Sequence, residues 1–132
     1  MNTRPNSRTI PLAAGLALSL AFAAPAAQAH HSFAMFDRDK VLTLDATVKA
    51  FQWTNPHSWI QLNVPDATGK PVEWSIEWGG VSGLYKQGVR ATSLKTGDKI
   101  TVLANPLKNG NPGGMARKIT GADGQQIGGR QG

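Results

Sequence analysis

The sequence of 132 residues contains no cysteine. This absence excludes a disulfide framework, a thiolate metal site and a cysteine nucleophile. A domain without disulfides depends on its hydrophobic core for stability. Any metal site in this chain must therefore use nitrogen, oxygen or thioether ligands.

The chain also lacks clusters of positive charge, although its formal net charge is +6. Its basic residues are scattered singly, whereas a surface that binds nucleic acid or an anionic membrane carries them in runs. The serines lie in no nucleophile elbow, and the glycine pairs lie in no phosphate-binding loop. We therefore expect no nucleic-acid partner, and the sequence favours a non-enzymatic role.

Residues 1–29 have the composition of a secretory signal peptide. Two arginines precede an apolar run over residues 10–24, and alanines at positions 27 and 29 form the expected cleavage site. The run is short for a bilayer-spanning helix of roughly 20 residues, so an uncut membrane anchor is the less favoured alternative. We expect cleavage after Ala29, export to the periplasm and no membrane span in the mature chain.

Cleavage would leave 103 of the 132 residues, enough for one domain with one core. We expect an extended N-terminal arm over residues 30–40 and a barrel domain over residues 41–121. Residues 122–132 are rich in glycine and glutamine and lack aromatic side chains, so they predict a flexible C-terminal tail.

Alternation of apolar and polar residues predicts an all-β fold. The longest alternating stretch runs from Val41 to Phe51, and shorter stretches cover residues 60–64, 72–78, 99–104 and 115–120. A short helix is expected within residues 81–88, and a loop over residues 105–114. Three strands, a helix and two strands is the order of the OB-fold, a small five-stranded barrel. Another small β-roll is the alternative.

The third predicted strand divides its side chains between two faces. Trp74 and Trp78 share a face with aliphatic residues, which predicts that they belong to the core. Glu73 and Glu77 fall on the opposite face, which predicts solvated carboxylates. No carboxylate accompanies the histidines at ligand spacing in the sequence, so zinc is less favoured than copper.

Cleavage after Ala29 would make His30 the N-terminal residue. Its α-amine, with a reference pKa of roughly 7.7 to 8.0, and its ring nitrogen can chelate one metal ion together. A third nitrogen from His31 or His57 would complete the planar set that Cu(II) favours, so copper is the predicted cofactor. The alternative is that the terminal pair has no role and that His57 is an ordinary turn residue.

Chain length tests whether His57 can join His30. The arm before Val41 spans at most about 36 Å, and the first strand covers roughly 33 Å. The arm could reach the turn at His57 if it folded back along that strand. Phe33 and Phe36 are the residues expected to hold it against the barrel, and Met35 is a possible thioether ligand for Cu(I) or a packing residue.

Trp53 and Trp59 lie on either side of the turn that contains His57. Exposed aromatic side chains on an OB barrel can form a ligand surface. The scattered charge argues against nucleic acid, so the expected partner is a peptide, a glycan or another periplasmic protein.

Three motifs carry a resemblance: HHSFAMFD at residues 30–37, WTNPH at residues 53–57 and EWG at residues 77–79. With them the chain resembles a family of short exported bacterial proteins of unknown function, which implies a small periplasmic domain and no assigned activity. The N-terminal histidine is also similar to the copper-binding histidine brace of periplasmic copper carriers and polysaccharide monooxygenases, although the chain is short for the latter.

Two functions follow as hypotheses. The first is a small periplasmic binding protein that takes up copper through His30 with His31 or His57. The second is an OB-type adaptor that binds a peptide, glycan or protein partner through Trp53 and Trp59.

Overall fold

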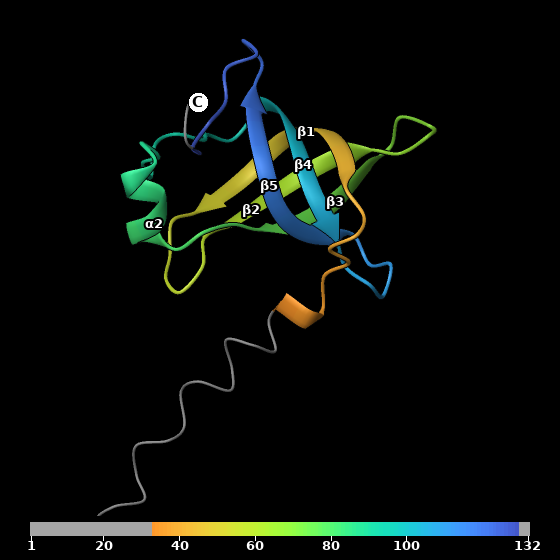
Figure 1. Ribbon diagram of the computed structural model, residues 1–132. Coiled ribbons are helices and arrows are strands. Elements are labelled where there is room, and N and C mark those ends of the chain that lie inside the picture. Colours follow the sequence, from red (N-terminus) through yellow and green to blue (C-terminus); the bar gives the residue numbers. More distant parts are fainter. Residues whose placement is uncertain (1–32, 130–132) are drawn as a thin grey trace, which may run out of the picture. The chain divides into compact units, whose positions relative to one another are not determined.

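The computed structural model describes residues 33–129. Its strands close into a barrel in the order β1-β2-β3-β5-β4, with one short helix between β3 and β4 (Figure 1). The elements are β1 (Leu42–Gln52), β2 (Trp59–Pro65), β3 (Pro71–Glu77), α2 (Val81–Lys86), β4 (Lys99–Pro106) and β5 (Gly113–Gly121). The predicted five-stranded OB-like barrel is confirmed.

Strand β1 belongs to both halves of the barrel. Its first half pairs antiparallel with β4 from Leu42 to Thr47, and its second half pairs antiparallel with β2 as far as Gln52. The register with β2 shifts between Val48 and Ala50. Such an irregularity bends a strand and increases its twist, which allows one long strand to close a small barrel.

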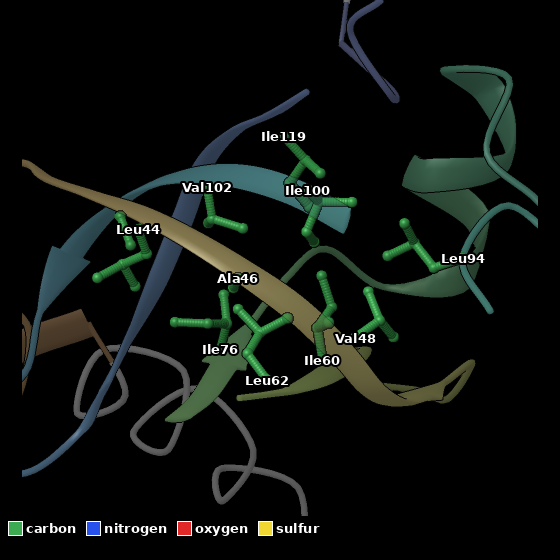
Figure 2. Packing of buried hydrophobic residues seen from close by; sticks show 11 residues of the cluster. Leu44, Ala46, Val48, Ile60, Leu62, Ile76, Leu94, Ile100, Val102 and Ile119 are labelled. Carbon is green, nitrogen blue, oxygen red and sulfur yellow. The ribbon is translucent and has the colours of Figure 1, made fainter. Parts of the chain in front are cut away.

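The core follows the alternation in the sequence. Inward-facing aliphatic side chains from all five strands fill the barrel, and Leu94 from the segment after α2 joins them (Figure 2). Ile60, Leu62 and Ile76 are fully buried, and burial of each such side chain stabilises the fold by about 1.5–3 kcal/mol. Trp74 and Trp78 are half-buried and pack against the margin of this core.

Only three register pairs join β3 to β5, and we call them the β3–β5 seam. They are Ser75 with Gly113, Ile76 with Gly114 and Glu77 with Met115, in parallel. A Cβ on Gly113 would lie 3.2 Å from the Ser75 carbonyl oxygen of β3, and one on Gly114 would lie 2.6 Å from the Asn105 carbonyl oxygen of β4. The glycines therefore permit a close approach, and β5 begins inside the stretch that glycine and proline content had predicted as a loop.

The arm is attached to the barrel through its middle. Phe36 is 2% exposed and pairs with Leu107, and the Asp37 N–H donates to the Pro106 carbonyl oxygen at 2.8 Å. Phe33, the other predicted anchor, is 45% exposed. Phe36 alone therefore holds the arm by a buried aromatic side chain.

The predicted flexible tail differs from the structure at residues 122–129. The Ile127 N–H donates to the Ile119 carbonyl oxygen at 2.8 Å, and Gln126 bridges to Thr120. The Ile127 side chain packs against the core. One apolar residue and a turn of glycines thus attach a segment whose polar composition had predicted fraying.

Across residues 33–129, no helix combines the length and the apolar character needed to cross a membrane.

Candidate functional site

Residues 53–58 form the loop between β1 and β2, which we call the His57 loop. Ser58 is fully buried, and its Oγ lies 3.3 Å from the Thr54 carbonyl oxygen, to which it donates. The Thr54 hydroxyl donates to the backbone oxygen of His57 at 2.8 Å. Asn55 Oδ1 accepts the Val81 N–H at 3.0 Å, which connects the loop to the start of α2.

The β2–β3 ladder continues into this loop. The Ser58 N–H donates to the Gly79 oxygen at 3.0 Å, and the Trp78 N–H donates to the Ser58 oxygen at 2.8 Å. Gly80 lies against the loop, because a Cβ there would be 2.5 Å from the Pro56 carbonyl oxygen. The backbone on both sides of His57 is therefore fixed.

The fixed loop places the His57 imidazole in contact with the Glu77 carboxylate. Nδ1 of His57 lies 2.6 Å from Oε1 of Glu77, and the two side chains are 32% and 5% exposed. The prediction of a solvated Glu77 is wrong. Alternation assigned it correctly to the outer face of β3, but the His57 loop covers that face at the end of the strand.

Two opposing effects act on the Glu77 carboxyl. Burial raises its pKa above the ordinary value, while His57 opposes this through its charge and its hydrogen bond. The pairing also sets the chemistry of the imidazole. With Nδ1 directed at a carboxylate, Nε2 is the ring nitrogen that remains for a metal ion or a proton.

Glu77 belongs to a row of side chains that crosses four strands on the outer face. Register places Trp59 of β2 beside Glu77, Glu77 beside Met115 of β5, and Met115 beside Asn105 of β4. We call these four residues the outer row. Asn105 is fully buried, because the arm covers it: its Nδ2 donates to the Lys40 oxygen at 2.6 Å.

The two tryptophans predicted to form a ligand surface have different neighbours. Trp59 is half-buried in the outer row beside Glu77. Trp53, also half-buried, packs edge-on against Phe51, with ring centroids 5.8 Å apart, and Phe51 contacts Trp78 in turn at 6.0 Å. Trp59 is thus adjacent to the His57–Glu77 pair, and Trp53 belongs to an aromatic cluster.

The described residues contain only part of the predicted metal site. His30 and His31 lie outside them, so their placement stays a prediction. Among residues 33–129, no three His, Cys, Asp or Glu side chains gather as metal ligands would. Met35, the predicted thioether candidate, is 49% exposed, and its backbone oxygen accepts the Lys108 N–H at 2.9 Å.

Sequence reasoning missed the contact between Glu77 and His57. A signal for Glu77 was available in the hairpin: the turn at residues 66–70 fixes the β2–β3 register, which pairs Trp59 with Glu77. The next residues before Trp59 then lie beside those after Glu77, so His57 falls near the carboxylate. No comparable signal exists for the β3–β5 seam, which places Met115 beside Glu77, because the two strands are distant in sequence.

The family model for a family of unknown function (DUF6152) matches residues 17–117. The chain belongs to this family. The match covers most of the chain and confirms the predicted membership in a family of unknown function, without assigning an activity or a ligand. No curated protein and no solved structure matches the chain.

Proposed function

We propose that this chain is an exported periplasmic protein that binds copper, with Nε2 of His57 as one ligand. The processed N-terminus, through the amine and ring of His30, supplies further nitrogens in this proposal, and His31 is the adjacent alternative. The observation that carries the proposal is the contact of 2.6 Å between His57 Nδ1 and a buried carboxylate.

This contact is the arrangement that prepares a histidine for a metal. A carboxylate on one ring nitrogen fixes the tautomer and the ring orientation, and it makes the other nitrogen more basic. The half-exposed imidazole remains open to solvent while its partner is buried. A histidine that only forms part of a turn needs neither a buried carboxylate at one ring nitrogen nor an imidazole open to solvent.

The arm lies beside one end of the outer row. Its residues Arg38 and Lys40 accept hydrogen bonds from Asn105, which stands in the same outer row as Glu77. Two interstrand spacings, about 10 Å, separate Asn105 from Glu77 across β5. Asp37, Phe36 and Met35 continue along the end of β4 to Pro106, Leu107 and Lys108, so the proposal requires the residues before Phe33 to turn back toward Glu77.

Copper is preferred because the proposed ligands are nitrogens. An amine and imidazoles in a planar set suit Cu(II), which also exceeds Zn(II) in general affinity. The carboxylate–histidine pair is compatible with zinc as well. Competition between the two ions is therefore part of the test.

The test is a titration of the processed protein, beginning at His30, with Cu(II) and Zn(II), read by calorimetry and electron paramagnetic resonance. We expect His57→Ala to remove one nitrogen from the copper hyperfine pattern. We expect Glu77→Gln to weaken copper binding about 10- to 100-fold. Glu73→Gln is the matched control, because Glu73 is an exposed β3 carboxylate paired with Lys49.

Two results would contradict the proposal. One is a copper spectrum that neither His57→Ala nor an additional residue ahead of His30 alters. The other is tighter binding of zinc than of copper. The intact mass of protein recovered from the periplasm tests export separately, with cleavage after Ala29 as the expected result.

A second candidate function is an adaptor that binds a peptide, glycan or protein partner through Trp53 and Trp59. The half-exposed Trp59 in the outer row favours it, since tryptophans at ligand surfaces combine apolar area with a polar N–H. The expected result is that Trp59→Ala abolishes capture of a partner from periplasmic extract, whereas Tyr85→Ala, at an exposed helix position, does not. Equal capture by both variants would exclude this function.

A further inference from the structure

We propose that a pocket on the outer face of β1 and β4 binds a small zwitterion, of the size and charge of a free amino acid. The pocket has a volume of about 310 Å³, at the lower end of the range for small-molecule sites. None of its lining residues belongs to the His57 loop or to the outer row. Occupation of this pocket therefore requires neither His57 nor a metal ion.

Three consecutive cross-strand pairs form the floor of the pocket. They are Asp45 with Thr101, Ala46 with Ile100 and Thr47 with Lys99. Side chains alternate between the two faces of a strand, so the first and third pairs face outward while the second pair belongs to the core. The floor therefore presents four polar side chains on one face.

The strands on either side of β1 and β4 complete the pocket. Beyond the pair of Thr47 with Asn63, β2 no longer pairs with β1, and Pro65 at the end of β2 lines one side. Gly121 at the end of β5 lines the other side together with Ala122. Small or apolar residues thus flank a polar floor, which suits a ligand with charged groups and a short aliphatic side chain.

Hydrogen bonds within the floor divide it into two halves. The Thr101 hydroxyl donates to Oδ1 of Asp45 at 2.7 Å, so the remaining lone pairs of both groups can accept hydrogen bonds. Nζ of Lys99 donates to the Thr47 hydroxyl at 2.6 Å, so the other ammonium protons and the Thr47 hydroxyl proton can donate. One half is therefore a negative acceptor, and the other half is a positive donor.

The charges of the pocket define the ligand. Asp45 and Lys99 are the charged residues among the nine that line it, so the pocket has no net charge and favours neither a simple anion nor a simple cation. Each charged group contacts a threonine rather than a group of opposite charge. The two halves lie about 7 Å apart along the strands. A ligand that contacts both halves needs an ammonium group and a carboxylate a few ångströms apart, as in an amino acid.

The test compares three compounds that share a branched carbon skeleton. They are L-valine, isovalerate, which lacks the amine, and isobutylamine, which lacks the carboxylate. Binding to the purified protein is followed by amide NMR shifts. We expect valine to give saturable shifts at Thr47, Lys99 and Thr101, and each analogue to bind about tenfold more weakly or worse, because it loses one charge-assisted contact.

Three results with the wild-type protein would overturn the proposal. They are equal affinity for valine and either analogue, saturable shifts that lie away from the floor, and the absence of a saturable shift with valine. These comparisons change only the ligand, so they do not depend on the folding of a variant.

Variants that remove one charge assign the two halves. We expect Asp45→Asn to bind valine no more tightly than isovalerate, and Lys99→Gln to bind valine no more tightly than isobutylamine. Lys49→Gln is the matched control, because Lys49 is an exposed β1 lysine outside the pocket that pairs with Glu73. Thermal melts check that each variant folds. A folded variant that still discriminates as the wild type does would overturn the role of the residue changed.

The pocket and the proposed copper site can be tested separately. Valine binding is measured in metal-free buffer, because the amine and carboxylate of an amino acid themselves chelate copper. We expect His57→Ala to bind valine as the wild type does, whatever its effect on copper. Loss of valine binding in His57→Ala would overturn the assignment to the β1–β4 pocket.

Discussion

Gly80 stands where the His57 loop meets the start of α2. A Cβ at this position would lie 2.5 Å from the Pro56 oxygen and 3.3 Å from Asn55 Oδ1. Backbone must therefore shift to accept any side chain. We expect Gly80→Ala to lower the free energy of unfolding by about 1–3 kcal/mol, measured by urea denaturation, and to weaken metal binding through displacement of His57.

Gly83 provides the matched control for Gly80. It lies inside α2, and a Cβ there would meet no atom within 4 Å. Alanine is favoured over glycine in a helix by up to about 1 kcal/mol. Gly83→Ala should therefore be neutral or stabilising, and a loss equal to that of Gly80→Ala would contradict the steric explanation.

Glu77 indicates what the alternation within one strand can predict and what it cannot. The period of the strand gave the correct face for Glu77, and the composition gave no reason to expect that face to be covered. Its burial depends on a loop that begins twenty residues or more earlier in the chain and is fixed by contacts with Gly79 and Gly80. Whether a loop covers the outer face of a strand depends on tertiary contacts, which the alternation of residues within that strand does not indicate.

At the scale of elements, the start of α2 depends on a side chain outside the helix. Asn55 Oδ1 accepts the Val81 N–H, while Gly80 at the N-cap has no side chain to do so. We expect Asn55→Ala to cost about 1 kcal/mol of unfolding free energy, measured by denaturation. Asn55→Asp keeps the acceptor oxygen and should restore most of this stability; equal losses in both variants would exclude the capping role.

The β2–β3 hairpin has an acid-sensitive turn. Hydrogen bonds from the Thr68 side chain, then from the Thr68 and Lys70 N–H groups, lower the pKa of Asp66 below its ordinary value of 3.8. The stabilisation is complete above the ordinary pKa and is lost as pH falls through the lowered one. Asp66→Asn should therefore flatten the decline of stability below about pH 4 in urea unfolding, and an unchanged decline would contradict this.

The elements themselves were largely predictable. Alternation located all five strands because one face of each is buried in a single core. The ends were less predictable: β4 continues to Pro106 and β5 begins at Gly113, although proline and glycine usually indicate loops. The pairing of β4 with β5, rather than the local conformational preference of proline and glycine, determines where these two strands end and begin.

At the scale of the whole molecule, residues 122–129 belong to the fold. Ile127 packs on the core and hydrogen-bonds to Ile119. We expect Ile127→Ala to lower the free energy of unfolding by about 1–2 kcal/mol, because its side chain is partly buried. Gln125→Ala changes an exposed side chain in the same segment and should be neutral. Calorimetric melts of both variants provide the comparison, and equal melting temperatures would contradict this role.

The fold class and the site differ in how far the sequence predicts them. A barrel follows from five alternating strands and a helix in the right order. The site depends on contacts between elements: the β2–β3 register brings His57 beside Glu77, and the β3–β5 seam adds Met115 to the outer row. One of these residues, His57, was accessible to motif reasoning.

The β3–β5 seam has three register pairs, whereas β2 and β3 share seven. A metal ion bound to His57 would stabilise the folded state, in which Glu77 lies at the end of this short junction. At a free metal concentration of a hundred times Kd, such binding adds about 2.7 kcal/mol to stability. Metal-free molecules would open at the seam more often and would be digested faster by proteases. The lifetime of the protein in its compartment would then follow the supply of metal.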